Sequence, residues 1–312
     1  MRELSFLSHG VRCSAWHLSA SGEASADARG RACVVMAHGF GGTRDTALLP
    51  YAQGFAAAGL DVLVFDYRGF GASDGTPRQR IAFRDQREDY RAAIEAARRI
   101  DGVDPERIVL WGTSYSGGHV VPVAATDGRI AAVIALTPAM DGLAALRALA
   151  GHGGVKRLGP LVWNGMRDAV GALVGRAPHH LPVVGPPGTV AVITAPGAME
   201  GYLALAGPTW RNEVCARTAL EVAFNRPTRF ATRLDCPMLV QIGELDSVAP
   251  PAAALSAAMA AGAKAEVRTY PVDHFDVYDG PWQQQALADQ VEFATRHLGA
   301  RPSTDAADTA RG

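Results

Sequence analysis

Short apolar runs alternate with helix-forming segments along most of this chain, and that alternation restricts its fold more than any other feature. Runs of this kind are typical of strands buried inside a parallel sheet. The segments between them carry good helix formers, with apolar residues three or four positions apart. The pattern predicts an α/β fold with a parallel sheet covered by helices on both faces. The expected strands are 32–39, 60–66, 107–112, 130–138, 237–243 and 265–271, and the expected helices are 46–59, 83–100, 251–262 and 283–299.

One long interval, between Pro138 and Pro237, breaks the alternation. It runs for about a hundred residues without an obvious sheet strand, which is too long for a simple connection in a compact domain. We therefore expect residues 139–236 to form a lid inserted into a main domain made of residues 1–138 and 237–299. Helical patterns occur in the lid near 142–150, 160–174 and 211–224, whereas five prolines forbid a continuous helix over 177–197.

The two ends of the chain depart from this pattern. Residues 2–18 indicate two short strands that turn at His9 and Gly10, followed by an exposed loop over 19–31. Residues 300–312 have no apolar periodicity, so we expect a loose tail there. The first strands contain no sustained hydrophobic run, which argues against a secretory signal and a membrane span. We expect a soluble, cytoplasmic protein.

Composition limits the partners of the chain. Thirty Lys and Arg residues against 31 Asp and Glu give a net charge of −1, too little to attract nucleic acid or anionic lipid broadly. The expected partner is a small molecule, and the sequence indicates no oligomeric state. The four cysteines form no C-x-x-C pair, which argues against a zinc site and a dense disulfide framework. No dinucleotide-binding or P-loop motif occurs, so we expect no cofactor.

The segment VLWGTSYSGG, residues 109–118, runs from an expected strand into small residues around Ser114. A nucleophilic serine must lie on a sharp turn between a strand and a helix, and such a turn needs small neighbours. Gly112, Ser116 and Gly117 supply them. The alternative is that Ser114 merely caps the following helix. Taken alone, the segment leaves both interpretations open.

This segment resembles the G-x-S-x-G nucleophile elbow of the α/β-hydrolase superfamily, with Ser116 in place of the last glycine. The resemblance extends over nearly the whole main domain. It implies the α/β-hydrolase fold, a mostly parallel eight-stranded sheet flanked by helices, with an inserted lid. The stretches GTSYSGGH and DHFDVY are most similar to serine esterases of the branch that includes Xaa-Pro dipeptidyl peptidase-like and dienelactone-hydrolase-like proteins.

A second glycine-rich segment, AHGFGGTRD at residues 37–45, resembles the oxyanion loop that follows the third strand in this superfamily. By that resemblance, the backbone N–H groups of Phe40 and Tyr115 hold the negative oxygen of a tetrahedral intermediate. An ordinary glycine turn is the alternative interpretation of this loop.

The segment FDYRGFGASDG, residues 65–75, resembles the D-x-R-G-x-G-x-S turn found after the next strand in many of these enzymes. Asp66, Arg68 and Ser73 can satisfy loop amides and one another by local hydrogen bonds. We expect these side chains to be structural and assign them no catalytic step.

The acid and the base are expected after late strands. Asp246 follows the strand at 237–243, at the carboxyl end of the sheet where open α/β folds collect their functional residues. Glu244 is a rival, but the superfamily's G-x-x-D pattern favours Asp246. His274 follows the last expected strand, and the order Ser, Asp, His is the chain order of this superfamily. We expect Ser114 to be the nucleophile, His274 the base and Asp246 the acid.

Other histidines carry weaker expectations. His38 belongs to the oxyanion loop, where it can brace the turn, and His119 lies on the helix after the nucleophile, where we expect it to be packed. The lid contains His152, His179 and His180 without a cysteine or carboxylate at metal spacing. We therefore expect no metal site.

Apolar residues of the lid could build a wall over the serine, in which case they select the substrate. The alternative is that they only pack the lid onto the main domain. The expected substrate contacts are Val192, Met199, Tyr202 and Trp210, within a wider apolar set that adds Val183, Val184, Val190, Ile193 and Leu203.

The expected function is hydrolysis of carboxylic esters or lactones with an apolar group, through an acyl-enzyme intermediate. A thioesterase or an acyltransferase of a biosynthetic pathway is the main alternative, because the triad would be the same. A peptidase would need an acidic pocket for the substrate's amino terminus, for which Glu200 and Glu213 are the only obvious candidates. A binding protein on an inactive hydrolase fold is a further alternative, since a fold does not fix a function.

Overall fold

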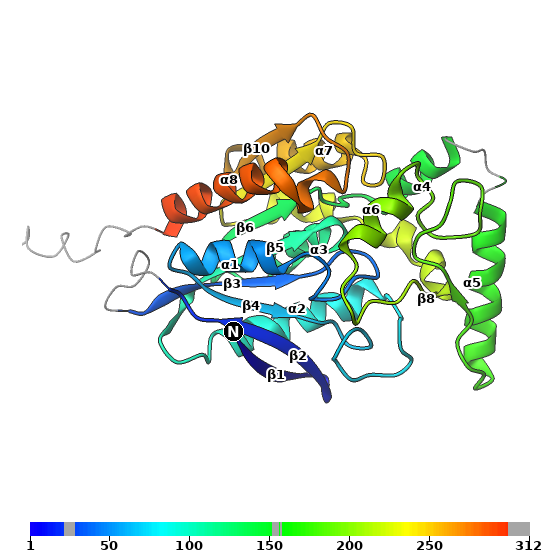
Figure 1. Cartoon of the computed structure of the whole chain (residues 1–312), viewed down its shortest axis with the longest axis horizontal. Helices are drawn as coiled ribbons and strands as arrows, with labels where there is room; N and C mark the ends of the chain where they lie inside the picture. Colours follow the sequence, from blue (N-terminus) through cyan, green and yellow to red (C-terminus); the bar gives the residue numbers. More distant parts are fainter. Residues whose placement is uncertain (22–28, 152–155, 157, 299–312) are drawn as a thin grey trace, which may run out of the picture.

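The main sheet has eight strands in the order β1-β2-β4-β3-β5-β6-β9-β10 in the computed structural model of the chain, which describes residues 1–21, 29–151, 156 and 158–298 (Figure 1). β2 pairs antiparallel with β1 and with β4, whereas the other neighbouring strands are parallel. The expected mostly parallel, eight-stranded sheet is confirmed. The strands are β1 (Arg2–Ser8), β2 (Val11–Leu18), β3 (Arg31–Ala37), β4 (Asp61–Phe65), β5 (Val103–Thr113), β6 (Ile130–Leu136), β9 (Met238–Gly243) and β10 (Ala265–Tyr270).

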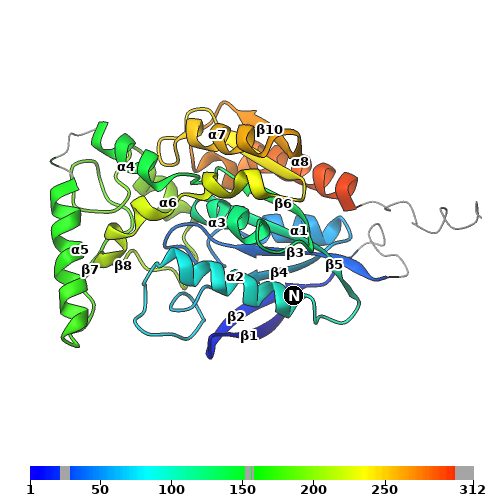
Figure 2. The same cartoon turned by 180° about the vertical axis from the view of Figure 1, so that it is seen from behind.

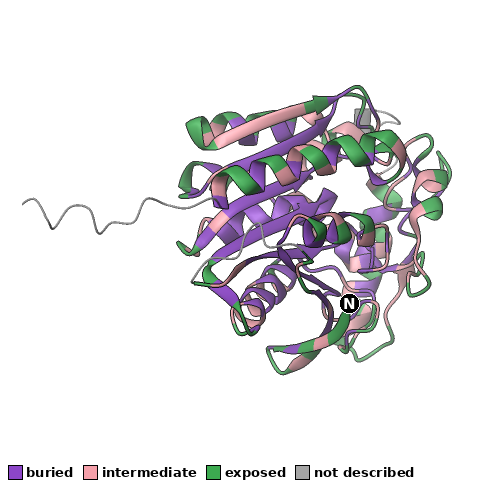
Figure 3. Ribbon diagram, turned by 60° about the vertical axis from the view of Figure 1, so that its left-hand side comes forward, coloured by how far each residue is buried: buried purple, intermediate pink, exposed green. Residues whose placement is uncertain are grey.

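Helices cover both faces of this sheet, and the side-chain alternation of the strands explains why. Along β3, Cys33 and Val35 pack under one layer of helices, while Val34 and Met36 pack under the other. Burial of a side chain such as Val35 contributes about 1.5–3 kcal/mol. Figure 3 shows the buried strands between helices whose outer surfaces are exposed. One layer holds α1 (Leu49–Ala57) and α8 (Gly280–Leu298), and the other holds α2 (Phe83–Ala97), α3 (Ser114–Ala124) and α7 (Pro251–Ala261) (Figure 2).

The elements that Figure 1 labels within residues 139–236 lie together at one end of the main sheet. Two of the helices expected there, near 142–150 and 160–174, are present as α4 and α5. A bidentate ion pair between Arg217 and Asp168 of α5, at 2.7 Å, holds the segment together. The elements are α4 (Gly142–Gly151), α5 (Leu158–Leu173), β7 (His180–Leu181), α6 (Ala198–Leu205), β8 (Val214–Cys215) and the 3-10 helices η2 (Ala216–Leu220), η3 (Val222–Phe224) and η4 (Pro227–Arg233).

The expectation of a helix near 211–224 is wrong. Instead, β8 pairs antiparallel with β7, and two short 3-10 helices follow. The N–H of Cys215 donates to the Gln79 carbonyl, and the N–H of Ala216 donates to the His179 carbonyl. These long-range partners replace the i to i−4 bonds that an α-helix would need, so tertiary pairing overrides the local helical pattern.

Some expectations fall on parts of the chain outside the described residues. These are the tail at 300–312, most of the loop expected over 19–31, and His152. In the described residues, no helix combines the length and the apolar character that a bilayer span requires.

Candidate active site

Ser114 lies on the sharp turn between β5 and α3, at the carboxyl end of the sheet. Its φ is +53°, a left-handed conformation that is strained for a residue with a side chain. The turn requires glycine at position 112, because a Cβ there would lie 2.3 Å from the carbonyl oxygen of Ser116. Thr113, not Ser114, occupies the N-cap position of α3. Ser114 therefore begins the helix while its hydroxyl faces the cavities described below.

Ser116 takes the position where the superfamily pattern has glycine. Its Oγ donates to the carbonyl of Ala37 in β3 at 2.7 Å and accepts from the N–H of Thr113 at 2.9 Å. The extra hydroxyl is therefore satisfied within the turn and ties the turn to the neighbouring strand. The departure from the pattern adds hydrogen bonds rather than disrupting the elbow.

A continuous line of hydrogen bonds joins the three residues expected to act together. His274 Nε2 lies 3.0 Å from Ser114 Oγ, and His274 Nδ1 lies 2.7 Å from Asp246 Oδ2. The other oxygen of Asp246 accepts from the N–H groups of Val248 at 2.9 Å and Ala249 at 2.7 Å. All three side chains are buried. The imidazole is thus fixed between a hydroxyl and a carboxylate, with Nδ1 as the donor to Asp246.

The loops that carry Asp246 and His274 are fastened to each other by Asp273. Its carboxylate accepts from the N–H of Ser247 at 2.7 Å and from the Ser247 hydroxyl at 3.0 Å. The N–H of His274 also donates to Asp273. The rival acid, Glu244, has an exposed side chain and is not among the partners of His274.

The glycine-rich loop lies against the serine as the oxyanion interpretation requires. A Cβ at Gly39 would lie 3.0 Å from Ser114 Cβ, so glycine allows the loop backbone to approach the hydroxyl closely. Tyr115 is the second residue of α3, where a helix leaves its N–H without an intrahelical acceptor. Within the described part of the chain, no hydrogen bond from the N–H of Phe40 is found. Two N–H groups beside the serine are thus available to an oxygen of a ligand.

Tyr202 and Thr209, both in residues 139–236, form hydrogen bonds with this loop. The hydroxyl of Tyr202, on α6, donates to the carbonyl of Phe40 at 2.8 Å. The ring of Tyr202 stacks on Trp210, with centroids 5.1 Å apart. Further along the loop, Asp45 accepts from the N–H and the hydroxyl of Thr209, at 3.0 Å and 2.8 Å. The inserted segment therefore contacts the loop at both ends and fixes the peptide next to the expected oxyanion donor.

Two other histidines near the serine are buried and neutral. His38 Nδ1 donates to the carbonyl of Gly39 at 3.0 Å, and burial lowers the pKa of His38 to about 4. His119 Nε2 pairs with Gln86 Oε1 at 3.0 Å, and burial lowers the pKa of His119 well below its usual range. Neither ring reaches the serine hydroxyl. His38 braces the loop, and His119 is packed inside the domain.

Of the two histidines described in residues 139–236, His179 forms hydrogen bonds within that segment. His179 Nε2 pairs with Asn164 Oδ1 at 2.7 Å, and the N–H of His179 donates to Asp168. The ring of His180 is half-buried. Across residues 1–21, 29–151, 156 and 158–298, no group of histidine, cysteine and carboxylate side chains is arranged to hold a metal ion.

Polar side chains stabilise the turn at 65–75 through hydrogen bonds and an ion pair. Asp66 accepts from the N–H of Arg44 at 2.7 Å, and the hydroxyl of Ser73 donates to the carbonyl of Asp66 at 2.7 Å. Burial raises the pKa of Asp66 to about 6, although the N–H groups of Arg44 and Ala72, which donate to its carboxylate, oppose that shift. Arg68 pairs with Asp89 at 2.6 Å. All of these contacts stabilise the turn, and none reaches Ser114.

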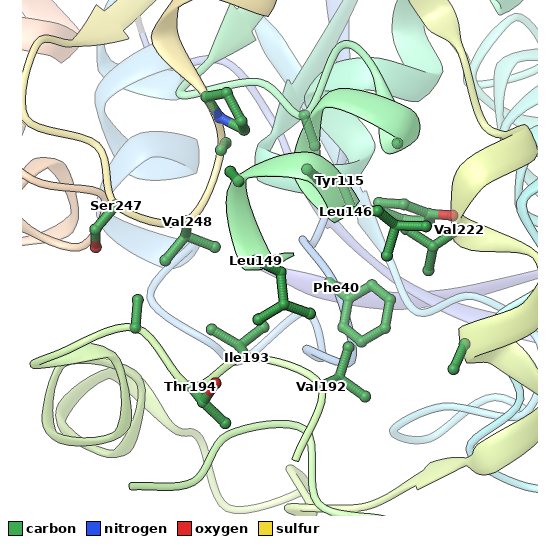
Figure 4. A pocket seen from close by; sticks show the side chains of 18 of the residues that line it. Phe40, Tyr115, Leu146, Leu149, Val192, Ile193, Thr194, Val222, Ser247 and Val248 are labelled. Atoms are coloured by element: carbon green, nitrogen blue, oxygen red, sulfur yellow. The ribbon is translucent and has the colours of Figure 1, made fainter. Parts of the chain in front are cut away.

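A large apolar cavity of about 310 Å³ opens beside Ser114. Figure 4 shows side chains converging on it from α4, from Phe40 in the glycine-rich loop and from residues 192–194. Its one carboxylate, Asp141, pairs with Arg226 at 2.7 Å and accepts from two N–H groups at the start of α4. The cavity is therefore suited to an apolar group. Lining side chains include Leu146, Leu149, Leu161, Val192, Ile193, Val222 and Val248.

A second, much smaller cavity of about 30 Å³ also opens at Ser114. His274 lines this cavity and does not line the large one. Besides Ser114 and His274, the small cavity is lined by Gly39, Phe40, Thr46, Thr113, Ile193, Tyr202, Leu205, Phe275 and Tyr278.

The four substrate contacts expected in the lid occupy different places. Val192 lines the large cavity and Tyr202 lines the small one. Met199 and Trp210 line neither and pack against the hydrophobic core. Of the wider apolar set, Ile193 lines both cavities, Val183 and Val184 are core residues, and Val190 and Leu203 are exposed.

The wall formed by α4 and α5 was not anticipated from the sequence. Leu146 and Leu149 on α4, and Leu161 on α5, lie at the helical spacing that a packed helix face also shows. That spacing predicts a buried stripe without distinguishing a core from a cavity. The only available signal was the position of both helices inside the interval that breaks the strand alternation.

The sheet order, the elbow and the two flanking loops define an α/β hydrolase, so the resemblance noted in the sequence is confirmed. A family model matches residues 28–272. The chain belongs to that family, described as serine aminopeptidase, S33.

The chain is similar to a bacterial and a fungal protein and to a solved structure. The quorum-quenching protein AidA of Acinetobacter baumannii (strain MDR-ZJ06) is 38% identical over 296 residues, which cover 94% of each chain. The polyketide transferase grgF of a Penicillium species is 34% identical over 157 residues, half of each chain. The crystal structure of the α/β hydrolase GrgF from Penicillium sp. sh18 matches with a TM-score of 0.80 at 25% identity, covering 96% of this chain and 99% of the other.

Proposed function

We propose that this chain is a serine hydrolase that cleaves carboxylic esters, including lactones, whose acyl part is apolar. The observation that carries the proposal is the hydrogen-bonded line from Asp246 through His274 to Ser114, which ends at the wall of an apolar cavity. A serine hydroxyl is a weak nucleophile by itself and becomes effective when an adjacent base accepts its proton. In this proposal, residues 139–236 serve as the lid of a catalytic domain formed by residues 1–138 and 237–299.

The reaction begins when His274 Nε2 takes the proton of Ser114 and the serine oxygen attacks the ester carbonyl carbon. The N–H groups of Phe40 and Tyr115 donate to the oxyanion of the tetrahedral intermediate, each worth about 3–4 kcal/mol. His274 then gives its proton to the leaving oxygen, and the acyl–oxygen bond breaks. In the second half of the reaction, His274 takes a proton from water, and the water oxygen attacks the carbonyl carbon of the acyl-enzyme. The bond from that carbon to Ser114 Oγ breaks, His274 returns the proton to Ser114, and a carboxylic acid is released. Asp246 stabilises the imidazolium in both halves.

A thioesterase or acyltransferase is the second candidate, because a relative that is 34% identical over half of its length is named a polyketide transferase. The same three residues would serve that chemistry. Comparing methyl esters with acyl thioesters of the same acyl chain separates the two functions. A hundredfold preference for thioesters would overturn the esterase proposal.

Peptide hydrolysis is less well supported, although the family description names an aminopeptidase. A substrate amino terminus needs an unpaired carboxylate close to the nucleophile. Among the described residues that line the large cavity, Asp141 is the one carboxylate, and it is paired with Arg226. Neither Glu200 nor Glu213 lines either cavity, and Glu213 pairs with Arg211.

A cytoplasmic location belongs to the same proposal. Cys13, Cys33, Cys215 and Cys236 are buried and free, as expected in a reducing compartment. Burial raises the pKa of Cys215 and of Cys236 to about 11, which keeps both thiols protonated and unreactive.

Covalent labelling by a fluorophosphonate tests the proposed nucleophile. We expect the wild-type protein to be labelled and Ser114→Ala to remain unlabelled. Ser256→Ala is the matched control, because Ser256 is on α7 and its hydroxyl bonds only to its own helix. An unlabelled wild-type protein would favour the reading of an inactive binding protein, and labelling that persists in Ser114→Ala would place the nucleophile elsewhere.

Replacing Tyr202 with phenylalanine should lower kcat about tenfold while KM changes less than about twofold. The Tyr202 hydroxyl orients the glycine-rich loop by its bond to the Phe40 carbonyl, and Tyr202 does not line the large cavity. Steady-state kinetics with a methyl ester of an apolar acid, followed by titration of the released acid, measure both constants. Tyr270→Phe is the control, since it removes a buried hydroxyl that bonds to Asp289 and Gln241 away from the site. An equal effect of both variants on kcat would contradict the positioning role of Tyr202.

A further inference from the structure

Two cavities of very different size meet at Ser114, and they differ in their access to the base. Phe40, Ser114 and Ile193 line both. The large cavity, about 310 Å³, continues past Tyr115 toward α4 and α5. The small cavity, about 30 Å³, contains the edge of His274. Among the described residues, the nucleophile therefore lies between an apolar cavity that His274 does not line and a narrow cavity that it does.

The position of the base decides which part of an ester enters which cavity. His274 Nε2 must donate its proton to the oxygen of the leaving alcohol, and later accept a proton from the oxygen that attacks the acyl-enzyme. Both oxygens must therefore lie on the His274 side of the serine. The acyl chain, which exchanges no proton with the base, takes the opposite side.

We propose that the small cavity is the site for the leaving alcohol of an open-chain ester and for the acceptor. Its size restricts that leaving group to short-chain alcohols, and it restricts the acceptor to water and short-chain alcohols. The inference rests on the proposed function and names its acceptor class. In the deacylation step, His274 takes the proton of the acceptor oxygen, which forms a bond to the acyl carbon. The bond from that carbon to Ser114 Oγ breaks, and His274 returns the proton to Ser114.

The volume of the small cavity sets this restriction. A cavity needs roughly 10–15 Å³ of such space to hold one water molecule. The value of about 30 Å³ therefore matches one or two molecules the size of water, or a short alcohol. An acceptor built on a long chain or a ring system is larger than this space and must extend out through its mouth while these walls keep their positions.

Hydrogen bonds hold most of those walls in place. The hydroxyl of Tyr202 is bonded to the Phe40 carbonyl, and that of Tyr278 is bonded to the hydroxyl of Thr113. The wall has two aliphatic side chains, Ile193, which also lines the large cavity, and Leu205, at the end of α6, which lines only the small one. Leu205 is therefore the residue whose truncation should enlarge the cavity without removing a polar contact of the site.

A grid of simple alkyl esters tests the proposal, with initial rates followed by titration of the released acid. In one series the acyl part is butanoate, and the alcohol changes from methanol to ethanol to butanol. In the other, the alcohol is methanol and the acyl part lengthens from acetate to octanoate. We expect kcat/KM to fall at least about tenfold from the methyl to the butyl ester, and to rise along the acyl series.

Two truncations on opposite sides of the serine form a matched pair. Leu205→Ala should raise the butyl-to-methyl ratio of kcat/KM at least about fivefold, because one removed side chain admits the longer alcohol. Leu149→Ala removes the same atoms from the large cavity and should shift only the preferred acyl length. A ratio that responds to Leu149→Ala and not to Leu205→Ala would reverse the assignment of the two cavities.

The wild-type series alone can overturn the inference, even if a variant fails to fold. Equal or faster cleavage of the butyl ester would show that the small cavity sets no limit on the alcohol. A protein that cleaves none of these esters and takes up no fluorophosphonate would instead contradict the proposed function. The two failures are therefore distinguishable.

Discussion

Replacing Ser114 with alanine is expected to lower kcat for a methyl ester of an apolar acid about 10⁵- to 10⁶-fold. The variant keeps the imidazole and the N–H donors but has no oxygen to attack the carbonyl, so it can form no acyl-enzyme. Alanine also removes an atom without adding bulk to a strained turn, where φ is +53°. The thermal unfolding midpoint should therefore stay close to the wild-type value. Stopped assays over several hours, with Ser256→Ala as the control, measure the residual rate.

Combining this change with His274→Ala tests whether the two residues act as one unit. Residues that share a single chemical step show strongly non-additive losses, so the double variant should be no slower than Ser114→Ala alone. The separation of 3.0 Å between His274 Nε2 and Ser114 Oγ motivates this expectation. Additive losses would mean that His274 acts on a step in which Ser114 takes no part. A Ser114→Ala rate within tenfold of the wild type would exclude Ser114 as the nucleophile.

The sheet could be predicted from the sequence because its central strands are buried on both faces. The run at 130–138, for example, corresponds to β6, whose side chains pack into the two helix layers alternately. The start of β5 could not be predicted in this way. That strand begins at Val103, four residues before the apolar run at 107–112, because Val103 pairs with Arg31 at the edge of β3. Polar residues between them hide the pairing from any pattern of hydrophobicity.

The inserted segment was less predictable, because its elements depend on partners far away in the chain. Residues 211–224 carry a helical pattern, yet Cys215 and Ala216 bond to Gln79 and His179. The contact between Tyr202 and Phe40 joins residues 162 positions apart, and nothing local to either residue announces it. Sequence patterns record the periodicity of an element and not the identity of its partner.

The chemical groups of the site were easier to anticipate than its shape. Ser114, Asp246 and His274 follow strands whose carboxyl ends meet at one edge of the sheet, so their chain order carries spatial information. The cavities have no such order. Their walls come from the oxyanion loop, α4, α5, α6 and the loop after β9, and their volumes depend on how these pieces pack.

Changing Asp246 to asparagine is expected to lower kcat about 10⁴-fold, although the side chain keeps its shape. Oδ1 of Asp246 accepts from the N–H groups of Val248 and Ala249, so an asparagine must place its own oxygen there. Its NH₂ group then faces His274 Nδ1, which can only accept. The ring is forced into the tautomer that carries its proton on Nε2, facing the Ser114 hydroxyl. A nitrogen that already bears a proton cannot take the proton of the serine.

The same argument fixes the control and the contrary outcome. Glu244→Gln removes a carboxylate two residues away that is exposed and does not contact the imidazole, so it should leave kcat within about twofold of the wild type. Histidine tautomers can be assigned by nitrogen NMR of labelled protein, and the Nε2–H form should dominate in Asp246→Asn alone. If Glu244→Gln were the inactive variant and Asp246→Asn stayed active, the acid of the site would be Glu244. An Asp246→Asn protein that is inactive but keeps the Nδ1–H tautomer would show that loss of charge, rather than the wrong tautomer, causes the defect.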